Sequence, residues 1–205
     1  MRTKARNTDI KERLVIAAWE LFTEKGYEET TITDIIERSK TSRGSFYHHF
    51  RAKEDLIFSL AYFFDENYDE WMQTLPPALS AVEKLTAFNQ YVFKNIESSR
   101  YAPFLSTLYG LQVMTGGTRH ILNPRRRYYQ ILNQFTKEGI DSGEISFPGS
   151  YKELSEQIAS LQRGLTYDWC LNEQRYSLLH RGNQIVSGYL YSLKSPDSEP
   201  HSHSV

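Results

Sequence analysis

The sequence predicts an all-α protein of about nine helices, and three observations carry this prediction. Apolar residues recur at spacings of three and four along most of the 205-residue chain, which places them on one helix face. Two Ser-x-x-Glu capping boxes, beginning at Ser80 and Ser150, mark helix starts within the chain. No segment shows a convincing strand pattern. The core is therefore expected to lie between helices alone.

Start and stop signals place the helices in order. Thr8 is the expected N-cap of the first helix, and Gly26 suits the left-handed position after its end. Thr31 and Ser42 are expected to cap two short helices. Pro76 ends the long helix before it, because proline cannot donate a hydrogen bond within a helix. The expected helices cover residues 9–25, 32–39, 42–50, 53–72, 80–99, 103–114, 124–142, 150–172 and 176–193.

Composition limits the class of protein. With 40% apolar and 24% charged residues, the chain can form a packed core. It has no run of about 18 apolar residues and no signal-peptide pattern, so we expect a cytoplasmic protein without membrane association. The single cysteine, Cys170, excludes an internal disulfide and a zinc site built on several thiolates. No metal or cofactor is expected. The net charge of −1 requires any nucleic-acid binding to come from a local face.

Residues 31–50 have the proportions of a helix-turn-helix, with two short helices joined by a turn of about four residues. In such a motif the second helix enters the major groove of DNA and presents its N-terminal residues to base edges. The alternative is an ordinary helical hairpin. Hydrogen-bond donors on the outward face of the second helix favour the DNA-binding reading, since they can reach bases and phosphates: Arg43, Ser45, Tyr47, His48 and His49.

Gly44 and Lys53 add to this pattern. Gly44 stands early in a short helix, where its low helix propensity is a cost unless the backbone must approach another surface closely. Lys53 begins the next helix, where its charge opposes the helix dipole unless it contacts a phosphate.

These residues together resemble the DNA-binding domain of the TetR family of transcriptional regulators. The resemblance covers about residues 8–60 and rests on Gly26-Tyr27, Thr30-Thr31-Ile32-Thr33-Asp34-Ile35, Ser42-Arg43-Gly44-Ser45-Phe46-Tyr47-His48-His49-Phe50 and Lys53-Glu54. It implies that Arg43, Gly44 and Ser45 read bases. It also implies contacts with the DNA backbone from Thr31, Thr33, Tyr47, His48, His49 and Lys53, with Ser42 at the start of the recognition helix.

Two residues in the turn depart from the family pattern. Lys40 replaces the usual turn glycine, and Thr41 replaces the small apolar residue that follows it. Lys40 could occupy a strained or reshaped turn, or add a phosphate contact.

The resemblance implies that the remaining chain binds a small effector. The region is rich in aromatic residues, and the whole chain holds 14 tyrosines, 11 phenylalanines and 3 tryptophans. Each is individually more typical of a core, but together they favour a mostly apolar pocket with a few hydroxyl groups. The candidate pocket residues are Tyr62, Phe63, Trp71, Phe88, Tyr91, Phe104, Tyr109 and Tyr128. Arg125-Arg126-Arg127 could bind an anionic effector or form a solvated helix start.

The last two helices carry apolar stripes and are expected to form a four-helix interface across a two-fold axis. Gly164 in mid-helix is expected to allow close helix packing. The alternative is a helix hairpin inside a monomer. The candidate dimer residues are Leu161, Gly164, Leu165, Trp169, Ile185 and Tyr189.

Residues 8–53 are thus expected to form the DNA-binding domain and residues 54–194 an effector-binding and dimerisation domain, followed by a disordered tail over 195–205. The leading interpretation is a ligand-responsive regulator, most often a repressor in this family, that binds a palindromic operator as a homodimer. The alternative is a helical small-molecule carrier or an enzyme. No recognisable catalytic constellation supports an enzyme, and a pure carrier would not need Arg43, Tyr47 and Lys53 on one face.

Overall fold

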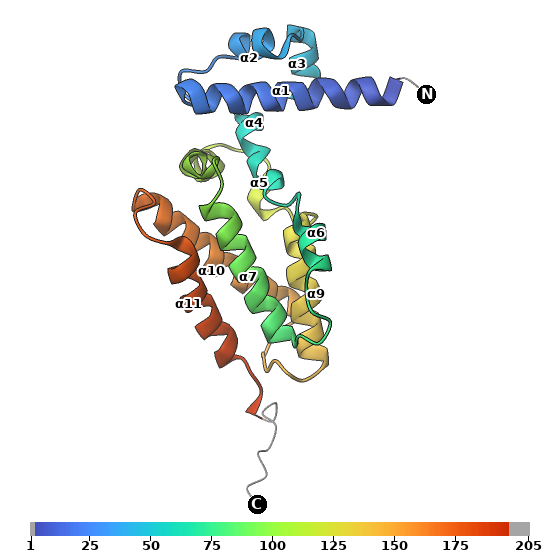
Figure 1. Ribbon diagram of the computed structural model, residues 1–205, viewed down its shortest axis with the longest axis vertical. Coiled ribbons are helices and arrows are strands. Elements are labelled where there is room, and N and C mark those ends of the chain that lie inside the picture. Colours follow the sequence, from blue (N-terminus) through green and yellow to red (C-terminus); the bar gives the residue numbers. More distant parts are fainter. Residues whose placement is uncertain (1–2, 197–205) are drawn as a thin grey trace, which may run out of the picture. The chain divides into compact units, whose positions relative to one another are not determined.

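The computed structural model describes residues 3–196, with side chains from Ile10 onward. Within these residues the fold is all-α, and no described helix is long and apolar enough to cross a membrane. In chain order (Figure 1) its helices are α1 (Thr3–Lys25), α2 (Ile32–Ser39), α3 (Arg43–His49), α4 (Glu54–Phe58), α5 (Leu60–Phe63), α6 (Tyr68–Gln73), α7 (Ala81–Glu97), η1 (Ala102–Phe104), α8 (Leu105–Met114), η2 (His120–Leu122), α9 (Arg127–Asp141), α10 (Tyr151–Leu171) and α11 (Leu178–Ser192).

The expected helix starts are largely confirmed. Thr31, Ser80 and Ser150 each cap their helix, and each forms a capping box with the acidic residue three positions later. Gly26 adopts a positive φ of 88° after α1, as its position predicted. The first helix differs from the expectation: α1 begins at Thr3, ahead of Thr8, whose side chain lies outside the described residues.

The long helix expected over residues 53–72 is wrong: the structure breaks it into α4, α5 and α6. Between α5 and α6 the backbone forms tight turns, in which the Asp65 N–H donates to the Tyr62 carbonyl at 2.9 Å. The Asp65 carboxylate accepts hydrogen bonds from Nε and Nη2 of Arg126 at 3.0 and 2.6 Å, and both side chains of this ion pair are only 9% exposed. Such a buried bidentate ion pair stabilises the turn. No signal in the local sequence predicts this turn.

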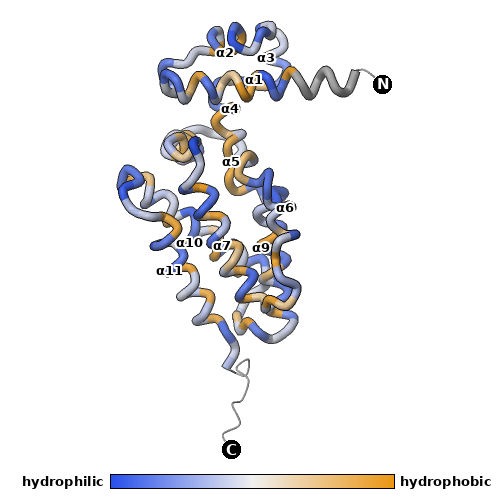
Figure 2. The backbone as a smooth tube through the Cα atoms, viewed as in Figure 1, coloured by the Kyte–Doolittle hydropathy of each residue, from blue (hydrophilic) through white to orange (hydrophobic). Residues whose placement is uncertain are grey.

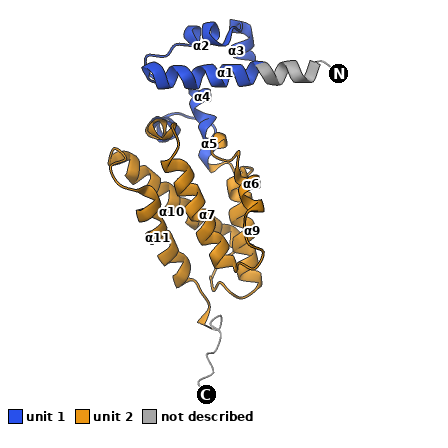
Figure 3. Cartoon of the chain, in the orientation of Figure 1, with its two compact units in different colours: residues 1–61, 107–121 blue, residues 62–106, 122–205 orange. Residues whose placement is uncertain are grey.

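The chain divides into two compact units (Figure 3). Unit 1 comprises residues 1–61 and 107–121, and unit 2 comprises residues 62–106 and 122–205. This division differs from the expected boundary after residue 53, which stays a prediction. The tail expected over 195–205 lies, apart from Ser195 and Pro196, outside the described residues.

Unit 1 builds its core where α1, α2 and α3 pack together. Leu14, Phe22, Ile35 and Phe46 are almost completely buried there. Figure 2 shows mostly hydrophobic residues along α5, whose first two residues, Leu60 and Ala61, end this stretch of unit 1.

Unit 2 is a bundle in which α7 packs against α9 and α11, and α10 packs against the same two helices. Its core contains polar as well as apolar side chains. Asn89 and Gln162 are buried and hydrogen-bonded to each other, with 3.0 Å between Gln162 Nε2 and Asn89 Oδ1. Outside the helices, one isolated antiparallel bridge joins Ile145 and Lys194.

Candidate nucleic-acid interface

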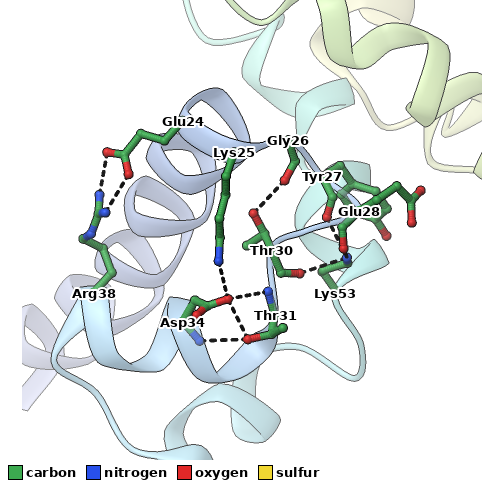
Figure 4. Close-up of polar contacts among 10 residues, drawn as sticks. All are labelled: Glu24, Lys25, Gly26, Tyr27, Glu28, Thr30, Thr31, Asp34, Arg38 and Lys53. Atoms are coloured by element: carbon green, nitrogen blue, oxygen red, sulfur yellow. Dashed lines mark hydrogen bonds and ion pairs between the residues drawn. The ribbon is translucent and has the colours of Figure 1, made fainter.

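The first helix of the motif, α2, is anchored at its N-terminus by Asp34 (Figure 4). The Asp34 carboxylate accepts from the Thr31 N–H at 2.8 Å and from Lys25 Nζ at 2.7 Å. The bonds from Lys25 and Thr31 hold the pKa of Asp34 well below its usual range. Thr31, predicted to contact the DNA backbone, therefore also serves as the cap of α2. Thr33 is exposed on the same first turn.

The turn between α2 and α3 places Lys40 in the left-handed conformation, with φ 52° and ψ 46°. A side chain with a Cβ is disfavoured there, and glycine is the residue that adopts this conformation freely. Arg13 of α1 supports the turn by donating to the carbonyls of Ser39 and Lys40. The structure thus has the strained turn that was suggested by Lys40 in place of the usual glycine. The Lys40 side chain is exposed.

The second helix, α3, separates a buried face from an exposed face. Phe46 is completely buried, whereas Arg43, Tyr47 and His48 are exposed. The Arg43 guanidinium lies 5.9 Å from the centre of the Tyr47 ring. His49 is half-buried, and burial, the adjacent His48 and Lys11 lower its pKa.

The start of α3 is fixed by Ser42, whose hydroxyl accepts from the Ser45 N–H at 3.0 Å. The two serine hydroxyls also lie 2.9 Å apart. A Cβ added at Gly44 would meet only the Ser42 hydroxyl, at 3.8 Å, so packing inside the chain does not require glycine at this position. The other reason for glycine at this position, predicted from the sequence, is that the helix backbone approaches a second molecule closely.

Lys53 has a role that sequence reasoning missed. Its ammonium donates to the carbonyls of Tyr27, Thr30 and Glu28 at 2.7, 2.9 and 3.3 Å, and lies 4.1 Å from the centre of the Tyr27 ring (Figure 4). These three carbonyls belong to the turn between α1 and α2. An ammonium has three hydrogens to donate, so all of them are engaged within unit 1. The phosphate contact predicted for Lys53 would have to compete with this clamp.

These features define the class of protein to which the chain belongs: a helical protein with an N-terminal helix-turn-helix. The N-terminal domain is that of the TetR family of transcriptional regulators. Residues 14–60 match the family model described as "Bacterial regulatory proteins, tetR family".

Relatives and solved structures extend this likeness beyond the motif. The chain is 24% identical over 178 residues to the fatty acid metabolism regulator protein of Bacillus subtilis (strain 168), covering 85% of this chain and 90% of that protein. The crystal structure of FadR from Bacillus subtilis in complex with stearoyl-CoA has a TM-score of 0.67 at 24% identity, over 90% of this chain and 100% of that chain. Thermus thermophilus FadR in complex with lauroyl-CoA has a TM-score of 0.71 at 17% identity, over 94% and 99%. These two structures share the fold.

The candidate pocket residues do not gather in one place. Trp71 and Tyr91 stack in unit 2 with ring centres 5.0 Å apart, and both line a groove of about 710 Å³. Phe88 is buried in the core against Tyr68, Trp71 and Tyr128 instead of lining this groove. Tyr109 belongs to unit 1, while Phe104 belongs to unit 2. Tyr62 and Phe63 are 38% and 36% exposed.

Tyr128 is buried and donates its hydroxyl to Gln162 Oε1. Burial raises its pKa well above the usual value. Of the basic triplet, Arg126 pairs with Asp65 and Arg127 pairs with Asp69, whereas Arg125 is exposed. Two of the three arginines therefore hold unit 2 together.

The candidate dimer residues divide between core and surface. Trp169 is 2% exposed within one chain and donates its indole N–H to the Tyr176 carbonyl at 2.7 Å, so its side chain packs inside the subunit. Ile185 is 41% exposed on α11, and Leu161 and Leu165 are half-buried on α10. Among the described residues, no atom beyond the neighbouring backbone of α10 lies within 4 Å of a Cβ built at Gly164, so close helix packing there would involve a second molecule. The Tyr189 hydroxyl donates to Gln157 Oε1 at 2.7 Å.

Proposed function

We propose that this protein is a ligand-responsive transcriptional repressor that binds a palindromic operator as a homodimer in the cytoplasm, and that it is not an enzyme. The observation that carries the proposal is the separation of faces on α3. Phe46 holds the helix to the domain, while Arg43, Tyr47 and His48 face solvent with their donors outward. This is the arrangement that a recognition helix needs to enter a major groove.

Base reading is assigned to the first turn of α3. Arg43 donates two hydrogen bonds to a guanine, and Ser45 reaches a neighbouring base edge. Gly44 lets the helix backbone approach the groove closely, in keeping with the open space around it.

Phosphate contacts are assigned to exposed residues around the recognition helix. Thr33, Lys40, Tyr47 and His48 are exposed and can reach the DNA backbone. Thr31 and Ser42 support the same surface through the caps of α2 and α3. His49, being half-buried, contributes at the edge of this surface.

A small, mostly apolar effector is proposed to bind the helical unit and release the operator. The aromatic residues of unit 2 support this, and two proteins of the same fold were crystallised with stearoyl-CoA and lauroyl-CoA. Release requires only that the effector bind the DNA-incompetent conformation better. A tenfold loss of operator affinity needs about 1.4 kcal/mol of coupling.

Dimerisation is proposed through the outer faces of α10 and α11. Ile185 exposes an apolar side chain there, and the surface of Gly164 is open to a partner helix. Two recognition helices would then lie about 34–36 Å apart, the distance between successive major grooves on one side of DNA.

The test combines DNA binding with assembly. The purified protein is expected to shift DNA from upstream of its own gene in an electrophoretic assay, and to sediment as a dimer at micromolar concentration. Gly164→Leu is expected to lower the dimer fraction without unfolding the protein, because no described atom beyond the neighbouring backbone of α10 lies within 4 Å of the new Cβ. A monomeric wild type would contradict the dimer, and failure to bind any upstream DNA would contradict the regulator.

A further inference from the structure

Unit 2 carries a groove between α6, α7 and α11 that the proposed DNA-binding surface does not use. Its volume of about 710 Å³ lies within the range of small-molecule sites, which is about 300–1,000 Å³. Trp71 of α6 and Tyr91 of α7 form one side of it. Their rings stack at an interplanar angle of 25°. A planar aromatic ligand would find a matching aromatic surface here.

The polar groups around the groove include strong donors beside hydroxyl and amide groups that can donate or accept. Lys94 and His180 line it, and its lining includes no carboxylate. Lys94 is exposed, and in the part of the chain that the structure describes its ammonium has no hydrogen-bond or ion-pair partner. The same holds for the indole N–H of the half-buried Trp71. A ligand that carries negative charge would engage these donors.

Two acidic residues lie close in the chain to residues that line the groove. Glu70 precedes Trp71, and burial together with the Glu70 carboxylate raises the pKa of Tyr91. Glu97 follows Lys94 by three residues and is engaged by the start of α11. The Glu97 carboxylate accepts from the Leu179 N–H at 2.6 Å and from the Ser177 hydroxyl at 3.2 Å, which anchors the N-terminus of α11. Glu97 therefore stabilises the start of α11 beside the groove, although Glu97 itself does not line the groove.

A hydrogen-bonded polar side chain lies among the residues that line the groove. Asn183 lines the groove, and its Oδ1 accepts from Asn89 Nδ2 at 3.2 Å. Asn89 in turn accepts from Gln162 Nε2 at 3.0 Å, and Gln162 accepts from the Tyr128 hydroxyl. This chain of hydrogen bonds, buried except at Asn183 where it is part-buried, joins four helices, from α11 through α7 and α10 to α9. It holds the Asn183 side chain in a defined position at the groove.

We propose that this groove is a binding site for a planar aromatic anion, such as a bicyclic aromatic carboxylate. The ring packs against Trp71 and Tyr91, and the carboxylate pairs with Lys94 beside His180. The proposal concerns binding at this groove, and it holds independently of whether the protein represses transcription.

The test follows the indole N–H resonances of the 15N-labelled full-length protein during titration with 2-naphthoate. The chain has three tryptophans, and Trp71→Phe identifies the Trp71 signal by its disappearance. Trp19 and Trp169 are 4% and 2% exposed, so their signals serve as internal references. We expect 2-naphthoate to shift the Trp71 resonance saturably and to bind about fivefold more tightly than the neutral 2-naphthamide, the preference of one solvent-exposed ion pair.

Lys94→Gln is expected to abolish the preference for the carboxylate while leaving amide binding unchanged. Lys94→Arg should restore the preference, and Lys152→Gln, a matched change at an exposed lysine of α10, should leave it intact. A Trp71 resonance that responds to neither ligand would overturn the proposal. So would equal affinity for acid and amide, or a carboxylate preference that survives Lys94→Gln. Operator binding by the same samples is a separate measurement. If the samples bind 2-naphthoate but not the operator, only the proposed function is contradicted.

Discussion

Replacing Lys53 with methionine separates two roles for this side chain. Methionine keeps much of the length and apolar stem of lysine but removes the ammonium that bonds to the carbonyls of Tyr27, Thr30 and Glu28. If the ammonium is a clamp for the turn between α1 and α2, the variant loses stability. If it contacts a DNA phosphate, the variant instead loses part of the salt dependence of DNA binding.

The magnitude follows from the surroundings of the ammonium. A hydrogen bond that involves a charged group contributes about 1.5–3 kcal/mol. Lys53 is half-buried, so water can partly solvate the carbonyls that the substitution frees. We therefore assign to the three bonds together the free energy of about one charged hydrogen bond. We therefore expect a loss of about 2 kcal/mol in the free energy of unfolding. For a protein of this length, that corresponds to a Tm lower by about 4–8 °C.

Two measurements decide between the roles: scanning calorimetry, and operator affinity at several salt concentrations. We expect Lys53→Met to lower Tm and leave the salt slope unchanged. Lys40→Met is the matched control, because Lys40 is exposed, and it should keep Tm while the slope decreases by about one phosphate contact. An unchanged Tm for Lys53→Met, together with a slope smaller by about one, would refute the clamp.

Three further outcomes are expected. Lys40→Gly should raise unfolding stability by about 1 kcal/mol in chemical denaturation, because glycine adopts the left-handed turn without cost, while operator binding weakens at low salt; an unchanged midpoint would mean that the turn is unstrained. Gly44→Ala should stabilise α3 by up to about 1 kcal/mol yet weaken operator binding, and full operator affinity would show that the backbone does not approach DNA closely. Because the pKa of Asp34 lies below its usual value, the unfolded chain takes up the proton first on acidification, so the stabilisation present above about pH 5 is lost as pH falls. Asp34→Asn should flatten this decrease in denaturation measured against pH, and a curve as steep as that of the wild type would contradict the assignment.

Sequence reasoning captured those parts of the fold that depend on local signals. The caps at Thr31, Ser80 and Ser150 act within three residues of themselves, and the structure has all three capping boxes. The break between α5 and α6 was missed because its main support, the ion pair between Asp65 and Arg126, spans residues far apart in the chain. A helical pattern of apolar residues persists through such a break and conceals it.

The candidate site shows the same limit. Residue types on α3 were sufficient to predict that Phe46 is buried and that Tyr47 and His48 face outward, since a helix has a fixed period. Ser45 and His49, also expected on the outward face, are half-buried. The contacts of Lys53 could not be predicted, because they depend on how closely the turn at Tyr27 approaches the start of α4. Trp169 was assigned to an interface because an apolar stripe looks the same whether it packs within one chain or against a second one.

The central claim is that α3 reads base sequence, and the specificity of Arg43→Ala tests it most directly. We would measure binding of the wild type and the variant to the operator and to non-specific DNA of equal length at one salt concentration. Loss of bidentate contact with one base pair costs about 1–3 kcal/mol, so operator affinity should decrease about 5- to 160-fold at each half-site while non-specific binding changes far less. A variant that loses affinity equally for both DNAs, or for neither, would contradict base reading by this helix.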